Sequence, residues 1–104
     1  MREGDLVRKI EKAILKRIPS AWVRKLSDTH TRGLPDLIAI WVFQRNYGVH
    51  LCTLMIEAKK PGGTRSALQE HEASKINDMK QPGLYWLFAE SVEDVTNLLN
   101  AWGQ

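Results

Sequence analysis

The sequence is poor in the residues that build covalent or metal cross-links. Its 104 residues include one cysteine, so an internal disulfide is excluded. Cys52 lies in an apolar segment and is expected to be a buried structural thiol. The three histidines, His30, His50 and His71, do not have the spacing of metal ligands, and no cysteine–histidine cluster indicates a zinc site.

Long apolar runs, repeats and low-complexity segments are also missing. No apolar run approaches the ~18 residues that a membrane span requires, and residues 1–5 show no signal-peptide pattern. We therefore expect an intracellular, cytoplasmic protein that forms a single domain over residues 1–104. The net charge of +3 permits a polyanionic partner without requiring one.

Hydrophobic periodicity and turn residues predict the order α-β-β-β-α-β-α. Helices are expected at residues 4–18, 67–80 and 92–102, and strands at 22–26, 37–43, 49–58 and 84–89. A turn at Asn46-Tyr47-Gly48 makes the second and third strands an antiparallel hairpin. The helix at 67–80 joins two strands as a crossover, which makes them parallel. The predicted fold class is α/β (α+β), with helices flanking a four-stranded mixed sheet.

Two acids and a lysine fall at the ends of neighbouring predicted strands. Asp36 precedes the strand at 37–43, and Glu57 and Lys59 end the strand at 49–58. Alternate side chains of a strand share one face, so Glu57 and Lys59 emerge side by side. A hairpin returns its outer ends to the same place, which brings Asp36 to Glu57. Such carboxylates can bind Mg²⁺ or Mn²⁺, and a lysine can orient water or neutralise charge at a phosphate. The pattern indicates metal-assisted phosphodiester hydrolysis.

An ordinary interpretation exists for each part of this pattern. A Glu-x-Lys triplet is common and is usually a solvated, salt-bridged strand edge. An acid after a proline, as in Pro35-Asp36, is an ordinary start of a strand. The occurrence of both at matching ends of two apolar strands is what favours a catalytic role.

Two further side chains are candidates to border this site. Glu3 projects near the middle of the apolar stripe of the first helix, whereas Glu11 lies toward the edge of that stripe. We therefore favour Glu3 as the helix acid, with Glu11 as the alternative. Gln69 lies in the first turn of the helix that follows the break at 61–63, and its amide could orient a metal or a phosphate. A surface glutamine is the alternative.

Basic side chains occur in the same loop and helix and just before Asp36. Basic groups around an acidic metal site suit a track for a phosphate backbone, although any one of them is also consistent with a solvated surface. The predicted DNA-binding residues are Arg32, Lys60, Arg65, His71 and Lys75.

Taken together, Gly33-Leu34-Pro35-Asp36, Ile56-Glu57-Ala58-Lys59, a glycine-containing loop and Leu68-Gln69 closely resemble the virus-type replication-repair nuclease (VRR-NUC) domain of the PD-(D/E)XK nuclease superfamily. The resemblance extends from Glu3 to about Leu99. It implies a restriction-endonuclease-like αβββαβ core. One departure is that Leu68 and Gln69 are adjacent, where the family often has more residues between its leucine and glutamine.

The resemblance also implies roles for individual residues. Mg²⁺ or Mn²⁺ would be bound by Asp36, Glu57 and the backbone carbonyl of Ala58, and Lys59 would assist the attacking water. Glu3 and Gln69 match the helix glutamate and the helix glutamine of the family. All five side chains, Asp36, Glu57, Lys59, Glu3 and Gln69, are therefore candidates for the catalytic site.

Stand-alone members of this size resemble homodimeric Holliday-junction resolvases. The resemblance thus implies a metal-dependent DNA endonuclease that acts in DNA repair, cuts branched DNA such as Holliday junctions, leaves 5′-phosphate ends and works in a bacterial or phage-infected cell. The four tryptophans and the strand at 84–89 would fill the core or form an apolar dimer face. Two alternatives stay open: a non-catalytic DNA-binding module or subunit with the same fold, and a restriction-like or RNA-directed nuclease.

Overall fold

The computed structural model describes residues 3–26, 33–46 and 48–104. Along this part of the chain the elements are α1 (Glu3–Arg17), β1 (Trp22–Lys25), β2 (Leu37–Arg45), β3 (Gly48–Ala58), α2 (Ala67–Asn77), β4 (Leu84–Ala89) and α3 (Val92–Ala101). This is the order that the sequence predicts. The bounds of α1, β1 and α3 differ from the predicted ones by a single residue at one or both ends.

The strands form one mixed sheet in the order β1-β2-β3-β4. β2 is antiparallel to both β1 and β3, whereas β3 and β4 are parallel and are joined through α2. Parallel neighbours need such a connection because the chain must return to the starting end before the next strand begins. The predicted α/β (α+β) architecture, a four-stranded mixed sheet flanked by helices, is confirmed.

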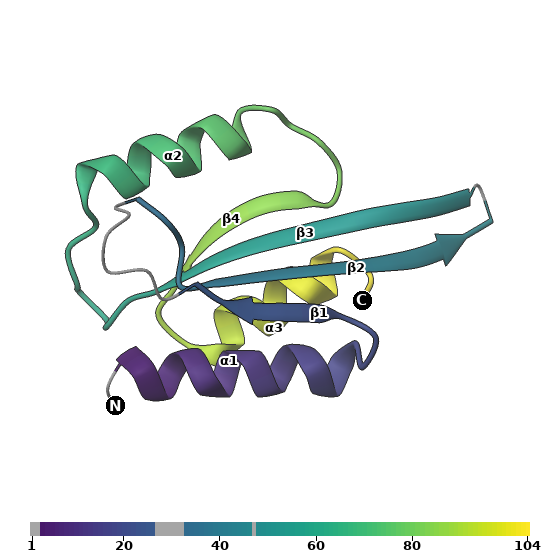
Figure 1. Cartoon of the computed structure of the whole chain (residues 1–104), viewed down its shortest axis with the longest axis horizontal. Coiled ribbons are helices and arrows are strands. Elements are labelled where there is room, and N and C mark those ends of the chain that lie inside the picture. Colours follow the sequence, from purple (N-terminus) through teal and green to yellow (C-terminus); the bar gives the residue numbers. More distant parts are fainter. Residues whose placement is uncertain (1–2, 27–32, 47) are drawn as a thin grey trace.

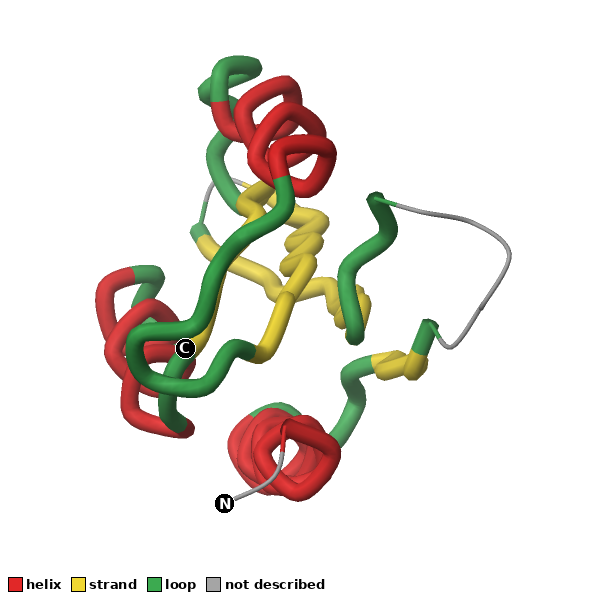
Figure 2. The backbone as a smooth tube through the Cα atoms, turned by 90° about the vertical axis from the view of Figure 1, so that its left-hand side faces the viewer, coloured by secondary structure: helices red, strands yellow, loops and turns green. Residues whose placement is uncertain are grey.

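The helices cover both faces of the sheet. α1 and α3 lie side by side on one face and α2 lies on the other (Figure 1, Figure 2). The main core lies between the sheet and the helices α1 and α3. It includes Leu6, Val7, Ile10, Ile14 and Ile18, which continue the predicted apolar stripe of α1. Arg17 donates to the Thr96 carbonyl over 3.1 Å and so ties the end of α1 to α3.

Alternation along β2 and β3 decides which side chains enter this core. Leu37 pairs with Ile56 and Ala39 with Leu54, and all four are completely buried. The residues between them point to the α2 face, because successive strand side chains face opposite ways. That second face carries Glu57, and it is where the candidate site lies.

The helix α2 ends at Asn77, three residues before the predicted end. Lys80 has φ of +51°, in the left-handed region that does not continue a helix. The Asn77 side chain donates from Nδ2 to the Trp86 carbonyl (3.1 Å) and accepts at Oδ1 from the Trp86 backbone N–H (2.8 Å). β4 is an edge strand, so a further strand could bind its outer main-chain groups. Asn77 already binds those groups at Trp86.

The β2–β3 hairpin is longer than predicted. Pairing continues to Arg45 opposite Gly48, whereas β1 pairs with β2 only as far as Ile40 and β4 pairs with β3 only from Thr53 onward. Beyond these rows no further described strand lies beside the hairpin, and its outer part projects from the body of the protein (Figure 1), while Trp41 and Cys52 at its base are still buried in the core. We call residues 41–45 and 48–52 the ribbon. The predicted turn at Asn46-Tyr47-Gly48 includes Tyr47, which lies outside the described residues.

The tryptophans are divided between core and surface. Trp41 and Trp86 are buried and Trp102 is partly buried, whereas Trp22 is 48% exposed. The core is therefore the place of most of them, and the buried Trp86 of β4 does not contribute to an apolar surface. Within the described chain, the helices are too short and too polar to cross a membrane.

Candidate active site

The strand register brings Asp36 and Glu57 together. Leu37 pairs with Ile56, so Asp36, one residue before β2, lies beside Glu57, one residue further along β3. Asp36 Oδ2 accepts a hydrogen bond from the Ala58 backbone N–H over 2.8 Å. This bond fixes the carboxylate of Asp36 to the end of the neighbouring strand, as the hairpin geometry in the sequence requires.

Among the described residues, Glu57 is the buried charged side chain, with 6% of the residue exposed. Its Oε2 accepts from Gln69 Nε2 over 2.7 Å and lies 3.4 Å from Lys59 Nζ. Its Oε1 is buried and accepts from no group in the described part of the chain. A buried carboxylate oxygen without a donor is costly, so this atom is a candidate ligand for a cation.

The environment of Glu57 opposes its ionisation. Burial raises the pKa of the Glu57 carboxyl above its ordinary value, and the nearby Asp36 carboxylate raises it further. The hydrogen bond from Gln69 and the charge of Lys59 act in the opposite direction without cancelling the rise. Two carboxylates, Asp36 and Glu57, lie beside the single ammonium of Lys59, so a metal ion would offset both the repulsion and the cost of burial.

The start of α2 positions Gln69. Ser66 caps the helix, and its Oγ accepts from the Gln69 backbone N–H over 3.0 Å. The cap sets where the helix begins and so turns the Gln69 side chain toward Glu57. Adjacent Leu68 and Gln69 are compatible with this contact, because the cap at Ser66 determines the register of the helix.

The loop before Asp36 packs directly on the same helix turn. A Cβ added to Gly33 would lie 3.0 Å from Leu68 Cγ and 3.6 Å from Glu72 Cγ, and Gly33 has φ of +85°. Only glycine adopts this conformation without strain and also admits the leucine so closely. Gly33 and Leu68 thus connect the segment that carries Asp36 with the helix that carries Gln69.

Lys59 emerges where β3 ends. Its backbone N–H donates to the Ala89 carbonyl over 2.8 Å, which holds the residue against the end of β4. A tight turn follows, in which Gly63 N–H donates to the Lys60 carbonyl over 2.7 Å. A Cβ on Gly63 would lie 2.9 Å from that carbonyl oxygen, so the turn requires glycine. The turn redirects the chain from β3 toward α2.

The basic residues of this loop and helix lie at the surface. Lys60, Arg65, His71 and Lys75 are all exposed, and Arg32 lies outside the described residues. The Arg65 guanidinium stacks over the Phe88 ring, 4.3 Å from its centroid. Phe88 pairs with Glu57 across the parallel strands, so this stack holds a positive charge beside the candidate site.

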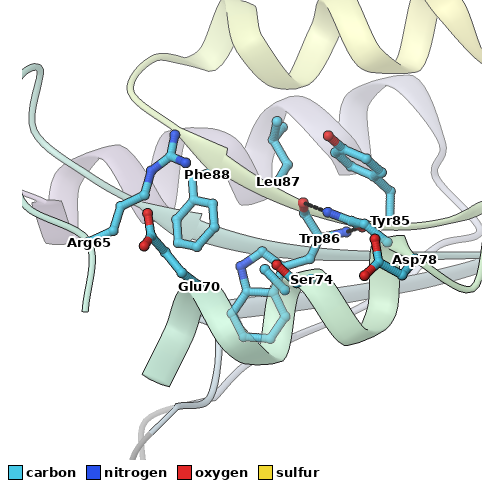
Figure 3. A pocket seen from close by; sticks show the side chains of 10 residues that line it. Arg65, Glu70, Ser74, Asp78, Tyr85, Trp86, Leu87 and Phe88 are labelled. Atoms are coloured by element: carbon cyan, nitrogen blue, oxygen red, sulfur yellow. Dashed lines mark hydrogen bonds between the residues drawn. The ribbon is translucent and has the colours of Figure 1, made fainter. Parts of the chain in front are cut away.

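Arg65 and Phe88 also line a cavity of about 400 Å³ between α2 and β4 (Figure 3). Glu70 lies beside Arg65 at this end of the cavity, and Asp78 and Tyr85 line the far end. The lining therefore carries both signs of charge, unlike a uniformly basic groove. Phosphate contacts are better served by the exposed residues at the Arg65 end.

The first helix reaches the same end of the sheet. α1 begins at Glu3, near the end where β2 starts and β3 finishes (Figure 1). The side chain of Glu3 lies outside what the structure describes. Glu11 is partly buried in the middle of α1, on the face of the sheet opposite α2.

The donor set fits a hard divalent cation better than zinc. Within residues 3–26, 33–46 and 48–104, no group of three or more His, Cys, Asp or Glu side chains gathers to hold a metal. Mg²⁺ is usually bound through one or two carboxylates and keeps several waters. Asp36 and Glu57 supply two such carboxylates, and the Oε1 atom of Glu57 accepts no hydrogen bond in the described chain.

Some parts of the site could not be found from the sequence. Phe88 reads as a core aromatic of β4, and nothing local connects it with Arg65, because β3–β4 pairing creates the contact. The Gly33–Leu68 contact joins residues 35 positions apart. A glycine before Leu-Pro-Asp is a visible signal, but its partner is visible only in the fold.

Comparison with solved structures is informative about the fold. No known family model matches the sequence, and no curated protein matches it. A solved structure described as "VRR_NUC domain" matches with a TM-score of 0.61 and 23% identity, over 94% of this chain and 94% of that one. The chain therefore has the fold of a VRR_NUC domain.

Proposed function

We propose that this protein is a Mg²⁺- or Mn²⁺-dependent endonuclease that hydrolyses phosphodiester bonds in DNA. The observation that carries the proposal is Glu57, a buried carboxylate with one donorless oxygen, beside Asp36 and within 3.4 Å of the Lys59 ammonium. The nuclease-type fold supports it. A structural salt bridge alone would not require the buried and unpaired Oε1.

The side chains divide the work. Asp36 and Glu57 hold the cation, with the Ala58 carbonyl as a further ligand. Such a cation, when bound, supplies Lewis-acid chemistry to the phosphodiester. Lys59 orients the attacking water and neutralises charge at the phosphate. Gln69 keeps Glu57 Oε2 occupied, which leaves Oε1 as the oxygen available to a ligand.

The remaining predicted site residues act around this centre. Glu3 borders it from the start of α1, with Glu11 as the less favoured helix acid. Arg32, Lys60, Arg65, His71 and Lys75 contact the phosphate backbone. Among these, Arg65 is held by its stack on Phe88, so less side-chain entropy is lost when it binds a phosphate.

We further propose that residues 1–104 work as one nuclease unit, as a homodimer, on branched DNA such as Holliday junctions, in DNA repair inside a bacterial or phage-infected cell. Two copies related by a two-fold axis present two sites, which suits paired cuts in a symmetric junction. The products would carry 5′-phosphate and 3′-hydroxyl ends.

A non-catalytic DNA-binding module with the same fold is the second candidate function. A surface that serves only to bind DNA would be expected to be more basic. The cavity beside Arg65 carries both signs of charge, and the net charge is only +3. The module predicts salt-sensitive DNA binding without cleavage in any metal.

The test is cleavage of a labelled four-way junction beside a linear duplex of matching sequence, in Mg²⁺, Mn²⁺ or EDTA. Wild type is compared with Lys59→Ala and with Lys12→Ala, an exposed lysine of α1. Metal-dependent cuts that Lys59→Ala loses and Lys12→Ala keeps would support the nuclease. Binding without cuts in either metal would favour the module. Cuts in the duplex as well would remove the junction preference but keep the enzyme.

A further inference from the structure

The face of the sheet that carries Glu57 is only partly covered. α2 packs mainly against β4, and it lies away from β1 (Figure 1). One row of paired residues across this face shows the result. Trp86 in β4 is buried, and its neighbour Met55 in β3 is partly buried. Ile38 in β2 is also partly buried, whereas Arg24 in β1 is exposed. Among the described residues, the half of this face over β1 and β2 is therefore the open one.

A tryptophan and an arginine lie together on this open half. Trp22 is two residues before Arg24 in β1, so both side chains share the face of the sheet. Trp22 is 48% exposed, and the Arg24 guanidinium lies over its ring, 5.1 Å from the centroid. Unpaired bases stack on exposed aromatic rings and on arginine planes of this kind. We call Trp22, Arg24 and their partners in β2, Ile38 and Ile40, the platform.

The charges around the platform suit a nucleic acid. β1, β2 and residues 48–56 of β3 contain no Asp or Glu, and their lysine and arginine residues are Arg24, Lys25 and Arg45. The charge of these strands is therefore of the sign that attracts phosphate groups. A duplex hides the faces of its bases within its own stack, so a stacking surface acts on unpaired bases. Apolar and basic groups without acids match the bases and phosphates of a single strand.

The platform is continuous with the candidate site. Trp22 pairs with Ile40, four residues after Asp36 along the chain. At ~3.4 Å per residue, Trp22 lies about 14 Å along the strand from Asp36. This distance corresponds to about four nucleotide steps of a duplex strand at ~3.4 Å each, and to fewer steps of a stretched strand. A strand whose phosphate is held at Asp36 and Glu57 can therefore place an unpaired base on Trp22.

We propose that the platform binds an unpaired segment of the DNA substrate, with a base stacked on Trp22 and a phosphate beside Arg24. The proposal rests on the proposed function in naming DNA as the strand. It goes further in assigning the choice of substrate to unpaired bases a few nucleotides from the cut, rather than to the phosphates of the duplex arms. Binding to the platform is measurable without metal and without cleavage.

The experiment measures DNA binding in EDTA, so that no strand is cut. One probe is a duplex with a single-stranded arm that contains 2-aminopurine, and the other is the same duplex without the arm. Wild type is compared with Trp22→Ala, Trp22→Phe and the control Tyr85→Ala. Tyr85 is 38% exposed, but it pairs with the buried Leu54 and so belongs to the opposite face of the sheet.

Wild type is expected to bind the armed probe more tightly than the plain duplex and to quench the fluorescence of 2-aminopurine by stacking. Trp22→Ala should weaken binding of the armed probe by about 10-fold, the effect of losing one stacked base, and should abolish the quenching. Its affinity for the plain duplex should not change, which also shows that the variant is folded. Trp22→Phe keeps a ring and should retain most of the preference, and Tyr85→Ala should behave as wild type.

Three results would overturn the proposal. They are a wild type with no preference for the armed probe, as expected if the platform serves a protein partner, a Trp22→Ala variant that loses affinity for both probes equally, and a control that loses as much as Trp22→Ala. The proposed function fails separately. A protein that stacks the base on Trp22 but cuts no DNA in Mg²⁺ or Mn²⁺ would keep the platform and lose the nuclease. A protein that cuts without any Trp22-dependent preference would keep the nuclease and lose the platform.

Discussion

The two ends of the β2–β3 hairpin differ in which side chains they bury. They lie roughly 27 Å apart, at ~3.4 Å per residue. At one end Asp36 and Glu57 lie among partners: Ala58, Lys59 and Gln69 contact them, and β1 and β4 flank the strands. At the other end, Val49 and Leu51 are apolar and more than half exposed. Charge is buried where the sheet is widest, and apolar surface is exposed where it is narrowest.

The reason for this contrast is the width of the sheet. A buried carboxylate needs donors and charges from several elements, which only the four-stranded end with α2 provides. In the described chain, the outer part of the hairpin has no third strand beside it, so its valines and leucine stay exposed. The comparison places the proposed chemistry at one end and an exposed apolar surface at the other, and the following changes test that division.

The largest effect is expected from Asp36→Asn. An amide oxygen can still accept from the Ala58 N–H, so the fold should persist, while the loss of the charge removes cation binding. Cleavage should fall by about 10³-fold or more, with an unchanged thermal unfolding curve. Leu51→Lys at the other end of the hairpin should keep metal-dependent nicking. Equal loss of nicking in both variants would break the division between the two ends.

Glu57→Gln should abolish cleavage and yet stabilise the metal-free protein at neutral pH. Burial and Asp36 raise the pKa of Glu57 above 4.5, so the folded state disfavours the ionised carboxylate. The stabilising contribution of the protonated form is complete below about pH 4.5 and is lost as the pH rises through the raised pKa. The neutral amide avoids that loss.

The measurement is thermal unfolding in EDTA of wild type and Glu57→Gln between acid and neutral pH. The variant should unfold at the higher temperature near neutrality, and the difference should shrink in acid. Glu90→Gln, at an exposed position, serves as the control and should show no such convergence. A wild type that is the more stable protein near pH 7 in EDTA would contradict the assigned environment of Glu57.

Gly33→Ala should reduce cleavage and stability more than Gly62→Ala. Both glycines have positive φ, so alanine strains both by about 1 kcal/mol, but a Cβ at Gly62 would meet nothing within 4 Å. At Gly33 it would press on Leu68 and displace the turn that carries Gln69. Leu68→Ala added to Gly33→Ala should recover part of the lost cleavage. Equal effects of the two alanines would mean that backbone strain alone matters.

The smallest effect is expected from Phe88→Leu. It removes the ring under Arg65, so the guanidinium should lose its fixed position while the apolar packing largely remains. We expect KM for DNA to rise by a few-fold at unchanged kcat, and Arg65→Ala to have the same effect without adding to it. Steady-state kinetics at two salt concentrations would check this. Additive effects would show that Phe88 acts independently of Arg65.

The parts that the sequence predicted well are those with a local signal. The apolar and aromatic run at residues 84–89 predicted β4 with both ends correct. Ser66 marked the start of α2 because its hydroxyl bonds to a backbone group three residues on. The end of α2 was predicted three residues too late, because Lys80 adopts a left-handed conformation that its residue type does not signal. The length of the ribbon was also underestimated, since Gln44 and Arg45 carry no strand signal apart from their pairing.

For the candidate site, the residue types and their strand ends were readable, but the contacts were not. Asp36 and Glu57 follow from the hairpin pattern, whereas the roles given to them remain predictions. The bond from Gln69 to Glu57 and the stack of Arg65 on Phe88 depend on how α2 packs on the sheet. No spacing along the chain encodes that packing, because it depends on contacts between distant segments, such as Gly33 with Leu68 and Asn77 with Trp86.

The sequence by itself determined the order of elements, the mixed sheet and the meeting of Asp36 with Glu57, because strand alternation and hairpin return are properties of the backbone. The tertiary structure alone decided that Glu57 Oε1 is buried without a donor, that β4 is protected by Asn77, and that the ribbon is left exposed. These outcomes depend on which surfaces the helices cover. Coverage is a matter of volume and contact between distant segments, which no local pattern specifies.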